Sequence, residues 1–155
     1  MTTDDIAPHA LVVRAAAGER VEAGGVEHVF ALTGTQTEGR SAVERFVLPA
    51  GALGARPHVH HAHDECFVVL AGELTVAAQG GETVLHAGDL AYAPRGSLHG
   101  FRNATAEDVT ALCLYTPAGY EQYFRDVHSA VEHGRELTED LLRGLRARHA
   151  TDTPA

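Results

Sequence analysis

Two short stretches of the sequence carry the residues that could do chemistry. The first, His58–Glu65, holds four histidines followed by an acid. The second, Gly88–Asn103, holds a lone histidine, His99, among turn-forming residues. Three or four of these imidazoles and one carboxylate would make an ordinary ligand set for a divalent transition metal. If the two stretches meet in one pocket, we expect a metalloprotein with enzymatic activity.

Strand geometry selects among the histidines of the first stretch. Side chains alternate between the two faces of a strand, so His58 and His60 point the same way and His61 points outward. Glu65 has the wrong parity for that face, so the chain must turn before it and begin a new strand. A polar surface loop is the plain alternative, but strand-forming apolar sequence flanks these residues. We predict His58, His60 and Glu65 as ligands, with His63 as an alternative to Glu65.

The second stretch presents His99 between two turns. Gly88 begins a turn into an apolar strand, and Pro94–Gly96 then bends the chain sharply. His99 follows at the head of the next strand, and Asn103 can close that strand with a side-chain to backbone bond. We predict His99 as the fourth ligand.

Short apolar runs separated by Gly, Pro and polar residues fill the sequence from about residue 10 to 116. This spacing predicts an all-β fold, an antiparallel sandwich or barrel, with Gly72 closing a hairpin. Helical spacing of apolar residues predicts two further helices within about 118–149, separated by Gly134. We expect a single domain over residues 1–155. The expected strands are Leu11–Arg14, Val26–Leu32, Ala42–Leu48, Cys66–Leu70, Leu74–Ala78, Glu82–His86, Asp89–Ala93 and Val109–Tyr115.

Composition excludes several classes of function. The chain has 155 residues and a formal net charge of -9, so it offers no basic stripe for nucleic acid. It contains no lysine, which excludes Schiff-base chemistry. No apolar run is long enough for a membrane span, and the acidic N-terminus lacks signal-peptide features, so we expect a cytoplasmic protein. Cys66 and Cys113 are expected to be free thiols.

Both stretches resemble the two motifs of the cupin superfamily. His58-x-His60-x4-Glu65-x6-Gly72 is similar to the first motif, and Gly88-x5-Pro94-x-Gly96-x2-His99-x3-Asn103 matches every specified position of the second. One departure is Ala52, which stands where the first motif has a glycine. The resemblance implies a cupin β-barrel, an antiparallel jelly roll or double-stranded β-helix. Its carried-over metal ligands are His58, His60, Glu65 and His99.

Residues 20 to 130 also resemble the small single-domain cupins of the quercetin 2,3-dioxygenase type, in segments such as Pro57–His61 and Thr116–Glu121. This implies a homodimer that binds one divalent ion of Fe, Mn, Ni, Co, Zn or Cu. It also implies a small enolisable aromatic substrate, with Glu65 as the catalytic base. In such an enzyme the enolate reacts with O2, and the ring is cleaved with loss of carbon monoxide.

Two other functions are compatible with the same residues. A metal-dependent polyketide cyclase or isomerase needs no oxygen, and an all-histidine ligand set that includes His63 would favour it. A non-catalytic sensor or binding module would use the same ligands. For an enzyme, we expect a mainly apolar substrate pocket, although most of its lining could equally be core. Arg56 could bind a substrate anion or lie at the surface. The predicted pocket residues are Phe46, Leu48, Phe67, Val69, Tyr92, Phe101 and Tyr115.

Overall fold

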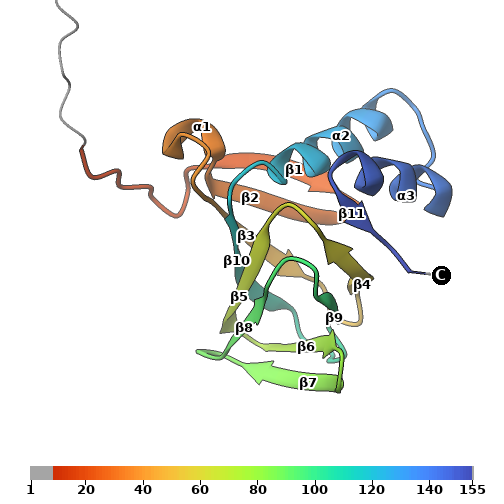
Figure 1. Cartoon of the computed structure of the whole chain (residues 1–155). Coiled ribbons are helices and arrows are strands. Elements are labelled where there is room, and N and C mark those ends of the chain that lie inside the picture. Colours follow the sequence, from red (N-terminus) through yellow and green to blue (C-terminus); the bar gives the residue numbers. More distant parts are fainter. Residues whose placement is uncertain (1–8, 155) are drawn as a thin grey trace, which may run out of the picture.

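The computed structural model describes residues 9 to 154, which fold into two antiparallel sheets with helices at one end (Figure 1). The predicted all-β sandwich is therefore confirmed. One sheet has the strand order β1 (Glu19–Ala23), β2 (Val26–Leu32), β3 (Ala42–Leu48), β10 (Val109–Thr116), β5 (Asp64–Ala71) and β8 (Leu90–Ala93). The other has the order β11 (Thr151–Asp152), β4 (Leu53–His60), β9 (Leu98–Arg102), β6 (Glu73–Ala78) and β7 (Gly81–His86).

Three helices accompany the sheets, α1 (Gly34–Thr37), α2 (Glu121–Glu132) and α3 (Glu139–Arg148). The last two are the predicted C-terminal helices, and the side chain of Thr138 accepts a hydrogen bond from Leu141 N to cap α3. α2 packs beside β1, where Arg125 and Glu19 form an ion pair at 2.7 Å. No helix among residues 9 to 154 is long and apolar enough to cross a lipid bilayer.

The apolar core lies between the two sheets. On β10, for example, alternate residues Val109, Ala111, Cys113 and Tyr115 are buried, as expected for a strand with one face inward. Cys113 and the half-buried Cys66 are free thiols, as predicted.

Two turns lead the chain from one sheet to the other, and the first of them, at Gly72, was predicted to close a hairpin. Gly72, at a positive φ of 80°, does not close a hairpin: β5 lies in one sheet and β6 in the other. The Pro94–Gly96 bend carries the chain between the sheets in the same way, from β8 to β9. The Pro94–Gly96 corner lies beside His60, because Gly96 N donates to His60 O, and the two motifs can therefore meet at this end of the sandwich.

The strand prediction was wrong at the N-terminal end. Leu11–Arg14 is not a strand, and Leu11 and Val12 are exposed without a partner strand to cover them. The chain instead begins its sheet with β1, paired to β2 across the Gly24–Gly25 turn. β1 escaped prediction because its five residues, Glu-Arg-Val-Glu-Ala, are mostly polar. Asn103 behaves as expected, because its side chain donates to Leu48 O at 3.0 Å and accepts from Thr105 N.

The contact between β4 and β9 depends on a glycine. A Cβ atom on Gly100 would lie 2.8 Å from both Ala55 O and Pro57 N, closer than real side chains approach backbone. β9 therefore lies against the irregular part of β4, directly beside the first motif.

We expect Gly100→Ala to force these strands apart and to destabilise the fold by about 1–3 kcal/mol, the usual cost of overpacking. Chemical denaturation would measure the change. Gly80→Ala is the matched control, because a Cβ there meets nothing within 4 Å. Equal stability of the two variants would contradict a close approach at Gly100.

Candidate metal centre

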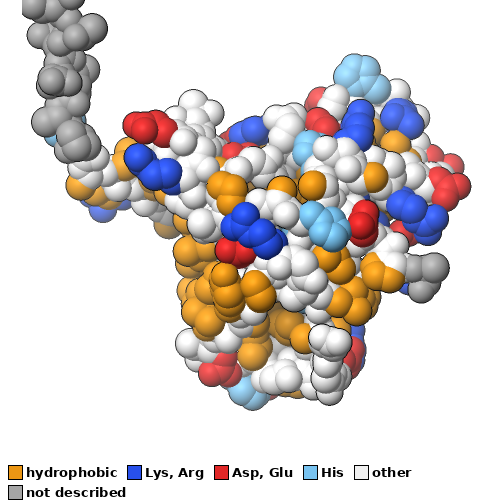
Figure 2. Space-filling view, in the orientation of Figure 1, with side chains coloured by type: hydrophobic (Ala, Val, Ile, Leu, Met, Phe, Trp, Pro, Cys, Tyr) orange, Lys and Arg blue, Asp and Glu red, His pale blue; other side chains and the backbone are white. Residues whose placement is uncertain are grey.

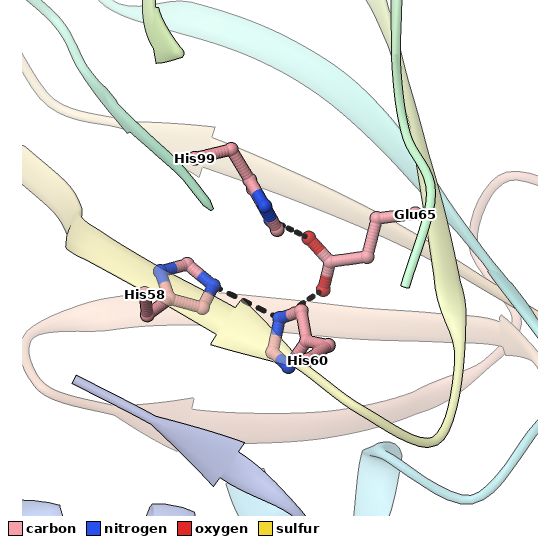
Figure 3. Close-up of side chains that lie close together, drawn as sticks. All are labelled: His58, His60, Glu65 and His99. Carbon is pink, nitrogen blue, oxygen red and sulfur yellow. Dashed lines mark hydrogen bonds and ion pairs between the residues drawn. The ribbon is translucent and has the colours of Figure 1, made fainter. Parts of the chain in front are cut away.

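Four predicted residues come together at one end of the sandwich (Figure 3). His58, His60, Glu65 and His99 are all buried, and one donor atom from each lies within 4.8 Å of the others. His58 Nε2 is 2.9 Å from His60 Nε2, which is 3.0 Å from Glu65 Oε1. The other carboxylate oxygen, Oε2, lies 3.0 Å from His99 Nε2. Three imidazoles and one carboxylate therefore face a common centre.

Three strands from both sheets supply these side chains. His58 and His60 project from the same face of β4, and His58 is the cross-strand neighbour of His99 on β9. Glu65 comes from β5 in the opposite sheet, after the turn at residues 61 to 63. As strand parity predicts, His58 and His60 share one face of a strand, and Glu65 lies on a new strand after a turn.

Two contacts tie the second stretch to the first. Gly96 N donates to His60 O at 2.7 Å. Arg95 binds Asp64, the residue before Glu65, through its Nε and its backbone N–H, both at 2.9 Å from Oδ1. These hydrogen bonds hold the pKa of Asp64 well below its usual range. The bend that precedes His99 thus also fixes the start of the strand that carries Glu65.

The outer nitrogen of each imidazole has an oxygen partner. His58 Nδ1 lies 2.7 Å from Arg56 O, and His99 Nδ1 lies 3.2 Å from Ser97 O. A carbonyl only accepts, so each Nδ1 carries a hydrogen, and in the neutral ring the lone pair then lies on Nε2, which faces inward. Such partners orient histidines that bind metals.

Thr151, which the sequence analysis missed, does the same for His60. Its Oγ1 lies 2.7 Å from His60 Nδ1 and donates its own hydrogen to His149 O at 3.1 Å. The hydroxyl must then accept from His60 Nδ1. Thr151 is fully buried on β11, which pairs with β4 directly opposite His60. No local motif marks it, because it lies 91 residues from its partner.

Burial controls the protonation of the cluster. It lowers the pKa of His58 to about 4, helped by the positive charge of protonated His60, and it also lowers the pKa of His60. Burial opposes ionisation of Glu65, but hydrogen bonds with His60, His63 and His99 outweigh it and hold its pKa well below the usual range. Burial likewise opposes protonation of His99, yet the bond to Glu65 raises its pKa. The cluster thus combines an ionised carboxylate with a neutral His58, while the bond to Glu65 favours a proton on His99.

This donor set fits a divalent metal ion. Because His58 and His60 both carry hydrogen on Nδ1, their Nε2 lone pairs face each other at 2.9 Å and repel unless a proton or cation lies between them. The low pKa of His58 disfavours the proton. Two atoms each about 2.1 Å from one ion, at about 90°, lie about 3.0 Å apart, close to the separations seen here.

The other two histidines of the first stretch differ from each other. His61 is half exposed and pairs with Asp152 on the surface at 2.9 Å. His63 is buried, packs against Tyr120, and places its Nε2 3.5 Å from Glu65 Oε1. Glu65 therefore joins the four-residue cluster, and His63 stands beside it.

A cavity of about 250 Å³ reaches the cluster through Glu65. Arg56 lies at its wall although the residue is exposed. α2 and α3 contribute Tyr123, Phe124 and Arg146, which the pocket prediction did not include. Of the predicted pocket residues, five line this cavity: Phe46, Leu48, Phe67, Phe101 and Tyr115.

Val69 and Tyr92 do not line the cavity. Val69 is fully buried in the core. Tyr92 is 59% exposed on the outer face of β8, near the exposed Leu70 and Leu90, where Figure 2 shows hydrophobic side chains gathered over β5 and β8. Tyr92 pairs across the strands with Cys66, while its neighbour Ala93 pairs with the inward Glu65, so strand parity turns Tyr92 outward.

Comparisons with known proteins show what the segment that holds this cluster is similar to. The sequence profile of the family described as "Cupin domain" matches residues 44–115, which include all four cluster residues. A protein of unassigned function from Aquifex aeolicus is 37% identical over 62 residues, 40% of this chain and 50% of that protein. Quercetin 2,3-dioxygenase from Bacillus subtilis is 27% identical over 123 residues, 78% of this chain and 35% of that protein.

This chain thus spans half or less of the length of these two relatives. Among solved structures, a sugar phosphate isomerase of the cupin superfamily from Silicibacter pomeroyi superposes with a TM-score of 0.60. The superposition covers 68% of this chain and 75% of that one, at 24% identity, and it is a likeness of fold.

Thr151→Val should weaken metal binding by about 10- to 100-fold, because it removes the acceptor that orients His60. Titration of the purified protein with Zn²⁺ against a competing chelator would measure the affinity. Thr83→Val, at an exposed position of β7, is the control for the substitution itself. Equal zinc affinity in both variants would remove Thr151 from the site.

Proposed function

This chain is a protein of the cupin superfamily, and we propose that it is a metal-dependent enzyme acting on a small enolisable aromatic substrate. We infer that the reaction is a dioxygenation similar to that of quercetin 2,3-dioxygenases. The ion would be one of Fe, Mn, Ni, Co, Zn or Cu, held by His58, His60, Glu65 and His99. The homodimer and the cytoplasmic location stay predictions.

One observation carries the proposal: Glu65 belongs to both the cluster and the cavity. Its two oxygens contact His60 and His99, and it is the one member of the cluster among the residues that line the cavity. A ligand in the cavity therefore meets a carboxylate first. A purely structural metal site would have no need of a cavity at one of its ligands.

In the proposed reaction, the metal ion, Glu65 and an aromatic wall each have a separate role. A metal ion at the cluster would act as a Lewis acid towards a substrate oxygen. Glu65, ionised and facing the cavity, would accept the proton of the substrate hydroxyl on a carboxylate oxygen. Phe67, Phe101 and Phe46 form an aromatic wall, with ring centroids 5.0 and 5.5 Å apart, that holds a planar ring and excludes water.

The oxygen-dependent reaction is supported by the relative from Bacillus subtilis, whose similarity extends over 78% of this chain. The second candidate is a cyclase or isomerase that polarises a carbonyl without oxygen. It is favoured by His63, which is buried beside Glu65 and could enlarge the histidine set. Oxygen consumption separates the two reactions.

We expect His99→Ala to lower the bound metal from about one ion per chain to well below half, because a buried ligand is removed. Elemental analysis of the purified proteins would measure it. His61→Ala is the matched control, since its ring lies in the same stretch but pairs with Asp152 on the surface. An unchanged metal content in His99→Ala would exclude His99 as a ligand.

With a flavonol such as quercetin, the metal-loaded protein should consume oxygen, as measured with an oxygen electrode. Glu65→Gln should lose at least about 100-fold of the rate, the usual contribution of a positioned base. Conversion of the flavonol at an undiminished rate without oxygen would overturn the dioxygenase assignment and favour the cyclase or isomerase.

A further inference from the structure

A second buried polar group lies in the wall of the same cavity. Glu44 on β3 accepts hydrogen bonds from His28 on β2 and from Tyr115 on β10, one at each carboxylate oxygen. All three residues line the cavity. Among the described residues, no hydrogen bond or ion pair joins Glu44 or His28 to the four residues of the metal cluster.

Glu44 is costly to keep at this position. The residue is 1% exposed, and a buried carboxylate lowers stability unless every lone pair finds a donor. Burial raises the pKa of Tyr115 well above its usual range, which keeps its hydroxyl protonated as one such donor. An apolar residue in place of a buried ionic group is often neutral or stabilising. Fold stability alone therefore gives little reason for an acid here.

The geometry leaves one nitrogen of His28 available to a ligand. Nδ1 faces Glu44 and donates its hydrogen there, so the neutral ring has an accepting lone pair on Nε2. Within residues 9 to 154, Nε2 has no hydrogen-bond partner in the protein. The side chain is 12% exposed and stands between Phe46 and Phe124, with ring centroids 6.5 and 4.3 Å away. An acceptor thus opens into an aromatic part of the cavity.

We propose that His28, oriented by Glu44, forms a second ligand-binding subsite that accepts the proton of an acidic hydroxyl, a phenol or an enol. In this step the O–H bond of the ligand breaks and an N–H bond forms at Nε2. The resulting imidazolium is balanced by the adjacent Glu44 carboxylate, as in other histidine–carboxylate pairs. No oxidant or further reactant is needed.

The class of ligand inferred for this subsite rests on the proposed function, and the subsite in turn narrows the class of substrate. Because one cavity touches both Glu65 and His28, a single aromatic ligand could place one oxygen at the metal centre and a hydroxyl at His28. The favoured substrates would then carry acidic or coordinating oxygens at two separate positions of a planar ring system.

The test uses 4-nitrophenol, whose phenolate absorbs at a longer wavelength than the neutral phenol. We expect the zinc-loaded protein to bind it as the phenolate, at a pH where the free compound is mostly neutral. His28→Gln should weaken binding by at least about tenfold, abolish the phenolate band and leave the zinc content unchanged. His86→Gln is the matched control, because His86 also pairs with a glutamate, Glu73 at 3.4 Å, but on the surface.

Two outcomes would overturn the subsite. One is a phenolate band that survives in His28→Gln but disappears when zinc is removed, because the metal then binds the phenol. The other is the absence of 4-nitrophenol binding to the folded wild-type protein. Glu44→Gln should reduce the phenolate band and, if it does not fold, His28→Gln decides alone. Failure of the wild-type protein to retain zinc would instead contradict the proposed function, and the zinc-free protein would then be tested with the same probe.

Discussion

The burial of Glu65 is the constraint around which the site is arranged. A carboxylate taken out of water is tolerated only where donors or cations surround it, and here His60, His63 and His99 do so. Those residues come from β4, the following turn and β9, whereas Glu65 comes from the opposite sheet. The two sheets must therefore converge at this end, and the sheet-switching corner at Pro94–Gly96 lets them do so. At this same end, β4 pairs irregularly with β9, and the absence of a side chain at Gly100 lets the two backbones approach closely.

The C-terminal segment completes this end of the sandwich. After α3, the chain returns through β11 and places Thr151 behind His60, while α2 and α3 supply aromatic and charged walls to the cavity. Tyr120 packs against both His60 and His63, with ring centroids 4.6 Å away in each case. A segment outside the strands of the cupin motifs thus both orients a ligand and shapes the space in front of the cluster.

The sequence predicted the parts of the site that local periodicity controls. Parity alone paired His58 with His60 and turned His61 outward, and the motif around Pro94–Gly96 located His99. Thr151 could not be found this way, because its contact joins residues 91 positions apart and depends on how β11 docks. The hairpin expected at Gly72 failed for a related reason: a glycine with positive φ marks a turn but does not say whether the next strand stays in the same sheet. Tyr92 pairs with Cys66, the neighbour of the inward Glu65, and adjacent residues of a strand point to opposite faces; strand parity therefore places Tyr92 outside the pocket.

Two buried carboxylates, Glu44 and Glu65, give the cavity its electrostatic character. Burial and both negative charges raise the pKa of Tyr115 and of Cys113 well above their usual ranges, so each group between the carboxylates stays neutral. The interior is thus negative, and it favours a cation where the imidazole nitrogens converge. Glu44 has no cluster of imidazoles around it, and its carboxylate is instead stabilised by hydrogen bonds that His28 and Tyr115 donate.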